Sequence, residues 1–172
     1  MKTLKIGEKV IYPNQGLGVI EAIHEEAYNG ERFTVYNLRI IANNTLVTLP
    51  SASALELGIR RPMPEESIRE IFHFMGNGAV DVTTDWKGRY KEHLNLMKSG
   101  TLFDMATVLK SLYYLSLQKP LSFREKKMME KAKELIVSEI SETVAVPCAK
   151  IEEKLLGALS RSFKTAKPRL AA

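Results

Sequence analysis

Hydrophobic residues follow two different periods along this chain. In the first 50 residues they form short runs rich in β-branched and aromatic side chains, which is the pattern of β-strands. Asn29-Gly30 suits a two-residue hairpin turn because both residue types tolerate positive φ. We therefore predict a small antiparallel meander, curled into a half-open barrel, with strands over residues 10–12, 17–23, 33–41 and 45–49.

After Pro50 the hydrophobic residues recur with the three- and four-residue spacing of α-helices. Ser122 and Glu125 form a capping-box pattern at the start of one helix, whereas Gly100 and Pro120 end two others. The pattern predicts a compact bundle of five helices, over residues 65–75, 85–98, 102–118, 122–143 and from about 147 onward.

These two patterns predict an α+β protein with two domains. Residues 1–60 form the β-module and residues 61–160 form the helical domain. The end of the chain, residues 161–172, is rich in Lys and Arg, and we expect a basic, mobile tail there. A β-module of about fifty residues has a small core and an exposed edge strand, which offers a docking surface for a partner.

Charge also separates the two halves. The chain carries a formal net charge of +5, with 25 Lys or Arg against 20 Asp or Glu. Residues 1–60 hold six of each sign, so the whole excess of positive charge lies in the second half. This asymmetry favours separate partners, with nucleic acid as the candidate partner of the basic half. Charges that merely keep both surfaces solvated would give the same totals.

The chain lacks the residue patterns of a catalytic, metal or cofactor site. His24, His73 and His93 are dispersed, and the single cysteine, Cys148, excludes an intrachain disulfide. No apolar run approaches the roughly 20 residues that span a bilayer, and the first residues lack the apolar segment of a secretory signal. We therefore expect a cytoplasmic protein without catalytic residues, metal or cofactor.

The single tryptophan, Trp86, lies at the start of a predicted helix. Three cations follow it within five residues, namely Lys87, Arg89 and Lys91. This combination suits a protein that holds phosphates with cations while a flat ring presses against bases. Apolar residues also follow at helical spacing, namely Tyr90, Leu94 and Met97. On local sequence alone, a core position is the more common role for such a tryptophan.

Several segments, in the order in which they occur, resemble motifs of the CarD/CdnL family. The run KIGEKVIYPNQGLGVI, from Lys5 to Ile20, is similar to that family's opening signature. Residues 46–50 (LVTLP) resemble its strand that ends in proline, and residues 57–60 (LGIR) resemble the turn that follows. Residues 85–91 (DWKGRYK) resemble its tryptophan-bearing helix start, and residues 121–126 (LSFREK) a late helix start. The resemblance covers about residues 4–145, and its specificity comes from the combined order.

Members of this family are non-enzymatic bacterial transcription regulators. The resemblance implies a Tudor-like N-terminal domain that binds the RNA polymerase β subunit and a helical domain that contacts promoter DNA. In the family, the tryptophan wedges into the minor groove at the upstream edge of the melted promoter and so stabilises the open complex. The corresponding DNA-binding set here, without sequence readout and dependent on polymerase, is Trp86, Lys87, Arg89, Tyr90 and Lys91.

The family pairs an edge strand of its N-terminal domain with a strand of the β subunit. The matching positions, with support from the neighbouring hairpin, are Glu26, Tyr28, Leu46, Val47, Thr48 and Pro50. Some members carry arginines where this chain has Glu26 and Thr48, and others a basic residue where it has Gly88. Salt bridges and phosphate contacts made at those positions therefore do not transfer to this chain.

Two other hypotheses compete on the sequence. A protein–protein adaptor would dock a peptide on the β-module and keep Trp86 in the core of a helical scaffold that does not bind DNA. A stand-alone nucleic-acid-binding protein would bind DNA tightly without polymerase. The family resemblance favours the polymerase-dependent regulator, which we expect to be a monomer without membrane contact, associated with the nucleoid through RNA polymerase.

Overall fold

The computed structural model describes residues 3–78, 82–83, 85–165 and 170–171. The chain divides into two compact units, Met1–Pro62 and Met63–Ala172. The first unit extends to Pro62, past the predicted boundary at 60, and the Arg61 side chain pairs with Glu8. Ile59 is buried there, and Arg60 exchanges backbone hydrogen bonds with Ile11 at 2.7 and 3.1 Å.

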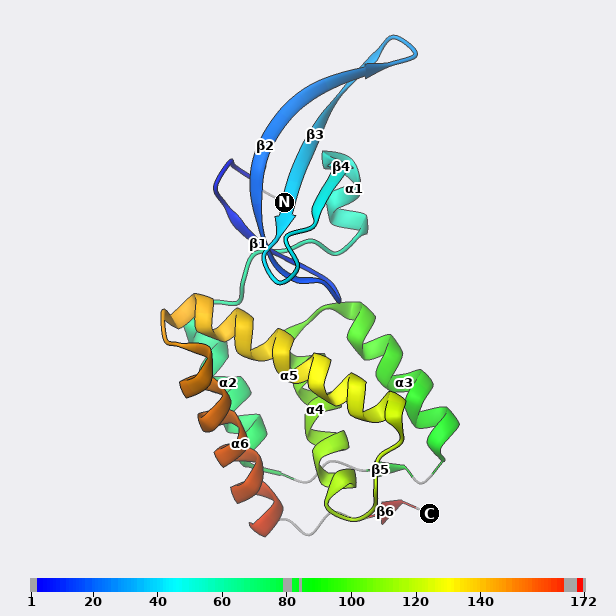
Figure 1. Cartoon of the computed structure of the whole chain (residues 1–172), viewed down its shortest axis with the longest axis vertical. Helices are drawn as coiled ribbons and strands as arrows, with labels where there is room; N and C mark the ends of the chain where they lie inside the picture. Colours follow the sequence, from blue (N-terminus) through cyan, green and yellow to red (C-terminus); the bar gives the residue numbers. More distant parts are fainter. Residues whose placement is uncertain (1–2, 79–81, 84, 166–169, 172) are drawn as a thin grey trace. The chain divides into compact units, whose positions relative to one another are not determined.

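The first unit is an antiparallel sheet with the strand order β1-β2-β3-β4 (Figure 1). Its strands are β1 (Lys9–Tyr12), β2 (Gly16–Tyr28), β3 (Glu31–Ile40) and β4 (Leu46–Pro50). Asn29 and Gly30, with φ of 52° and 84°, join the paired residues Tyr28 and Glu31 as the predicted two-residue turn. The predicted meander is confirmed, although β2 continues past residue 23 to Tyr28.

The far end of the β2–β3 hairpin extends beyond the other strands. β1 pairs with β2 only over residues 16–19, and β4 pairs with β3 only over residues 35–39. Residues 24–32, termed the hairpin arm from here on, are all exposed. Figure 1 shows this arm reaching past β4 and the short helix α1 (Ser51–Glu56). The arm therefore contributes surface to the first unit and adds little to its core.

The strands and α1 enclose a small apolar core. Its buried members are Leu4, Val10, Ile20, Tyr36, Leu38, Ile40, Leu49, Ala54 and Ile59. Gly18 allows β2 to approach β3 closely, since a Cβ there would lie 2.7 Å from Leu38 Cδ1. The sequence did not predict α1, because the helix has 6 residues and its N-cap, Pro50, makes no side-chain cap.

Among the described residues, five helices form the second unit, as predicted. They are α2 (Glu65–Gly76), α3 (Trp86–Ser99), α4 (Leu102–Ser116), α5 (Phe123–Val144) and α6 (Cys148–Thr165). Side chains of Asp85, Thr101 and Ser122 accept hydrogen bonds from backbone N–H groups and so fix where three of them begin. Ser122 and Glu125 form the predicted capping box. The predicted α+β class is confirmed, and no described helix is both long and apolar enough for a bilayer.

Helix α4 lies in the core of the second unit and is buried on almost every side. Its buried residues include a charged one, Lys110. The ammonium of Lys110 donates to the carbonyl oxygens of Phe74, at 2.6 Å, and Asn77. Burial lowers the pKa of Lys110 to about 8. This lysine therefore caps the carbonyl groups at the end of α2, which lack helical partners.

Residues 161–165 of the predicted tail form the end of α6. Ser162 is buried; its hydroxyl contacts the Tyr114 hydroxyl and donates to the Gly78 carbonyl oxygen at 3.1 Å. A tail prediction based on Lys and Arg content could not detect this buried side of the helix. Beyond it, β6 (Leu170–Ala171) pairs in parallel with β5 (Val82–Thr83), and residues 166–169 and 172 lie outside the described residues.

Candidate functional site

The start of α3 is fixed by Asp85. Its carboxylate accepts hydrogen bonds from the backbone N–H groups of Lys87, at 3.1 Å, and Gly88, at 3.0 Å. Gly88 leaves room for this cap, since a Cβ there would lie 2.6 Å from Asp85 Oδ2. Trp86 is thereby the first residue of the helix, whereas its indole ring lies outside the described side chains.

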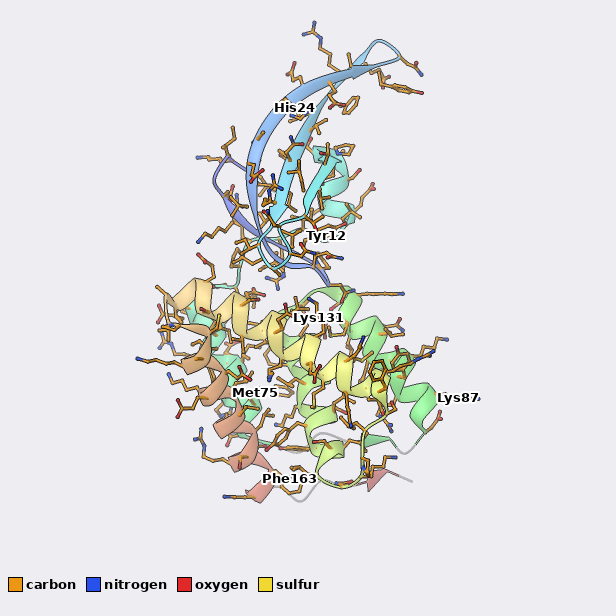
Figure 2. All side chains as sticks on the ribbon, viewed as in Figure 1. Tyr12, His24, Met75, Lys87, Lys131 and Phe163 are labelled. Carbon is orange, nitrogen blue, oxygen red and sulfur yellow. The ribbon has the colours of Figure 1, made fainter. Side chains whose placement is uncertain are left out.

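Lysine side chains occupy the outer face of α3. Lys87, Lys91 and Lys98 are exposed and share one face, because positions i, i+4 and i+11 align on a helix. Leu94, at i+7 in the same line, is 37% exposed. Figure 2 shows Lys87 at the outer end of α3, pointing away from the other helices. The predicted set omitted Lys98, although its spacing from Lys91 indicates the same face. These three residues, termed the lysine row, can follow a phosphate backbone.

Arg89 does not belong to this face. Its side chain is 2% exposed, and its Nη2 donates to Glu125 Oε1 at 2.5 Å. The structure therefore places Arg89 away from the lysine row, because two residues of helical rotation turn it away from Lys87 and Lys91. Tyr90 is half-buried and packs against the helical core, so only part of its ring can reach a ligand.

The buried face of α3 also differs from the sequence pattern. The sequence places Tyr90, Leu94 and Met97 at the spacing of a buried face, whereas the buried side chains among those described on α3 are Arg89, His93 and Met97. Two of these three are polar, so a search for apolar spacing could not locate the line. Glu125, on a helix far along the chain, supplies the charge that makes burial of Arg89 tolerable.

Burial and charge set the ionisation of this polar line. Burial, assisted by the Arg89 cation, lowers the pKa of His93 to about 4, and the Glu125 carboxylate partly offsets this. For Glu125, burial raises the pKa, but hydrogen bonds from Arg89 and Ser122 outweigh it and hold the pKa below its usual value. At neutral pH a neutral imidazole therefore lies near a charged arginine–glutamate pair.

A second exposed cationic surface lies at the start of α5. Phe123 is 71% exposed, and Lys127 Nζ lies 4.8 Å from the centroid of its ring. Arg124 and Lys126 beside them are exposed as well. Since Arg89 on α3 pairs with Glu125 in the first turn of α5, both helix starts belong to one region of the second unit. The capping-box pattern of this segment predicted a helix start but not an exposed aromatic residue.

The other candidate surface is the outer edge of β4. Within the described part of the chain, β4 pairs with β3 and no strand pairs with its other side. The Ile40 N–H donates to the Thr45 carbonyl oxygen at 2.8 Å. Because successive residues of an antiparallel strand alternate in direction, the backbone groups of Leu46 and Thr48 point away from β3. Leu46 is 45% exposed, and Thr48 and Pro50 are exposed beside it.

The remaining residues predicted for this surface do not lie on that edge. Val47 is half-buried and packs against the core of the first unit. Glu26 and Tyr28 lie on the hairpin arm, where Tyr28 is 72% exposed and Glu26 Oε1 lies 3.0 Å from His24 Nε2. The six predicted residues thus separate into an edge group, an arm group and one core side chain.

An apolar groove of about 560 Å³ opens between α2, the end of α5 and α6. Ile68, Phe72 and Ile151 are among the residues that line it, with charged residues such as Arg69 and Lys154. None of the residues predicted from the sequence lines it. No group of three His, Cys, Asp or Glu side chains that could hold a metal ion occurs within the described ranges.

Comparisons with known proteins match both units. Residues 70–156 match the family model "CarD, C-terminal domain", and residues 4–63 match "CarD-like/TRCF RID domain". The "Putative transcription factor YdeB" of Bacillus subtilis (strain 168) is 32% identical over 136 residues, which cover 79% of this chain and 89% of that protein. The solution NMR structure of the 72-residue N-terminal domain of Myxococcus xanthus CarD is 30% identical, with a TM-score of 0.30, and the match covers 34% of this chain and 79% of that chain.

Acid should destabilise the second unit through His93. The pKa of His93 is about 4 in the folded chain and 6.5 without the protein environment. Between these values the unfolded chain binds a proton that the folded chain does not, so the stabilisation present above pH 6.5 is lost as the pH falls. The expected loss in the free energy of unfolding is about 2 kcal/mol at pH 5 relative to pH 7. Urea unfolding followed by Trp86 fluorescence at both pH values measures it.

His93→Gln is the matched control, because glutamine does not titrate in this range. Its free energy of unfolding should change less between pH 7 and pH 5. An equal loss in both proteins would show that another group causes the pH dependence.

Proposed function

This chain belongs to the CarD family, and we propose that it is a transcription regulator that binds RNA polymerase and stabilises the open promoter complex. The family resemblance found in the sequence is confirmed. The proposal is based on the presence of two separate surfaces. The first unit has an edge at β4 that is unpaired among the described strands, and the second unit has the lysine row on the helix that begins with Trp86. A regulator that holds polymerase with one domain and DNA with the other needs both surfaces.

We assign the polymerase contact to β4. The match to the CarD-like/TRCF RID domain, residues 4–63, includes the whole sheet. In this proposal β4 pairs with a strand of the polymerase β subunit, and the outward backbone groups of Leu46 and Thr48 form the hydrogen bonds. The exposed side chains of Leu46 and Pro50 add apolar contact.

The hairpin arm influences which partner surface is compatible. Its charged residues are exposed and comprise Glu25, Glu26, Glu31 and Arg32. This excess of acids, beside exposed Tyr28, complements a basic surface and repels an acidic one. We therefore expect the part of the β subunit that meets the arm to carry Lys or Arg.

We assign the DNA contact to the outer face of α3. Lys87, Lys91 and Lys98 hold backbone phosphates, and Trp86 stacks at the upstream edge of the melted segment. Stacking of a base on an aromatic ring contributes about 1–3 kcal/mol. A change of about 1.4 kcal/mol shifts the ratio of open to closed complex tenfold, so one ring is sufficient to matter.

Tethering makes this contact effective. Three phosphate contacts without base readout give weak binding that falls steeply with salt. When β4 holds polymerase at the promoter, the DNA contact becomes intramolecular, and a high effective concentration compensates for low affinity. Polymerase thus determines the promoter, and the lysine row needs no sequence preference.

Thr48→Pro should weaken binding to RNA polymerase about tenfold or more. Without the Thr48 N–H, a carbonyl oxygen of the partner strand would be buried without a hydrogen bond, which costs about 1–3 kcal/mol. The change removes an outward N–H and no backbone hydrogen bond to β3. Pull-down of the bacterium's polymerase by the full-length chain measures binding, and circular dichroism checks folding.

Thr48→Val is the matched control for this experiment. It keeps the backbone N–H and removes only the hydroxyl, which donates to Asn37 Oδ1 at 3.0 Å. We expect it to bind polymerase normally. If folded Thr48→Pro also bound normally, pairing through the β4 edge would be wrong.

Single changes of Lys87, Lys91 or Lys98 to Ala should each reduce affinity for fork-junction DNA about eightfold at 0.1 M salt. Each change should also move the slope of log affinity against log salt by about 0.9, from a wild-type value near −2.7. Fluorescence anisotropy of labelled DNA across a salt series measures both quantities.

Lys150→Ala serves as the control, because Lys150 is an exposed lysine on α6 rather than α3. It removes the same charge and should leave the slope unchanged. Equal slopes for all four variants would remove the lysine row as the DNA surface.

A further inference from the structure

One carboxylate joins the starts of α3 and α5. Glu125 Oε1 accepts a hydrogen bond from Arg89 Nη2 at 2.5 Å, and the two side chains are 8% and 2% exposed. Glu125 Oε2 accepts hydrogen bonds from the Ser122 N–H at 3.0 Å and the Ser122 hydroxyl at 2.8 Å. The same group therefore closes the capping box of α5 and holds the fourth residue of α3.

The fully buried side chains described in the first half of α3 are polar. Among its described side chains from Lys87 to His93, those of Arg89 and His93 are buried and that of Tyr90 is half-buried. Met97, the first buried aliphatic side chain described on this helix, lies two turns beyond Arg89. The buried aliphatic packing described on α3 therefore lies in its second half, whereas the half that carries Trp86 is held by the Arg89–Glu125 pair and the partial packing of Tyr90.

We propose that Arg89 and Glu125 are positioning residues, whose buried pair fixes the direction in which α3 presents Trp86 and the lysine row to DNA. The inference rests on the function proposed for this surface. A planar guanidinium restricts the rotation of its helix through directed hydrogen bonds, which a lysine ammonium does not do. The carboxylate cannot change partners without leaving a buried charge uncompensated.

The opposite role for Arg89 makes an opposite prediction. If Arg89 were a phosphate contact for which Glu125 competes, removal of the Glu125 charge would free the Arg89 cation and strengthen DNA binding. A positioning pair predicts weaker binding, although the variant has gained net positive charge. The sign of the change therefore separates the two roles.

Glu125→Gln is the direct test, because glutamine also fits a capping box and the start of α5 is kept. We expect the full-length variant to bind fork-junction DNA about eightfold more weakly at 0.1 M salt, equivalent to losing one phosphate contact. Glu130→Gln, a change of an exposed acid on the same helix, should bind as tightly as wild type or more tightly. Equal or tighter binding by Glu125→Gln would overturn the proposal.

A second variant guards against simple loss of folding. In Arg89→Met/Glu125→Leu, apolar side chains replace the whole pair, a change that often preserves stability. We expect a folded protein that binds DNA as weakly as Glu125→Gln, with lower fluorescence anisotropy from its single tryptophan. Wild-type affinity and anisotropy would overturn the positioning role.

The lysine variants distinguish this inference from the proposed function. One outcome is that the lysine variants weaken DNA binding while Glu125→Gln and Arg89→Met/Glu125→Leu leave DNA binding unchanged. In that case the proposed function stands and the positioning role fails. If the lysine variants also bind normally, the DNA surface itself has been assigned incorrectly.

Discussion

The second unit contains two buried cations, each of which donates hydrogen bonds to oxygen atoms from another part of the chain. Arg89 pairs with Glu125, and Lys110 donates to the Phe74 and Asn77 carbonyl oxygens while lying 4.7 Å from the centroid of the Phe74 ring. Removing one member of a buried ion pair typically costs about 3–5 kcal/mol, so Arg89 and Glu125 fix each other's positions. The hydrogen bonds of Lys110 fix the two carbonyl groups in the same way. Lys110 secures the end of α2 and Arg89 secures the start of α3. These are the two ends of the segment that leads into the proposed DNA surface.

The two proposed interfaces use different physical interactions, which suits them to different tasks. At the edge of β4, backbone groups can form directional hydrogen bonds that specify one partner strand, and the acidic arm adds discrimination by charge. At the outer face of α3, the lysine row gives a sequence-independent and salt-sensitive attraction. A specific contact with polymerase combined with a tolerant contact with DNA allows one protein to act at many promoters.

Features that depend on neighbouring residues were predictable from the sequence. The Asn29-Gly30 turn and the Ser122 capping box are local, and both occur where expected. Features that need distant partners were not predictable. Arg89 pairs with a residue 36 positions away, so a count of cations near Trp86 could not separate this buried arginine from the exposed Lys87. The family motifs located the segment but not the face of α3 that points outward.

The central claim is that this chain, held by RNA polymerase, delays collapse of the open promoter complex through Trp86. The lifetime of competitor-resistant open complexes, formed with the bacterium's polymerase and full-length protein, tests it directly. Trp86→Ala should shorten the added lifetime about tenfold, as expected for a loss of about 1.4 kcal/mol, while polymerase pull-down remains unchanged. Trp86→Phe should retain part of the effect because it keeps an aromatic face. An unchanged lifetime with folded, polymerase-bound Trp86→Ala would contradict the claim.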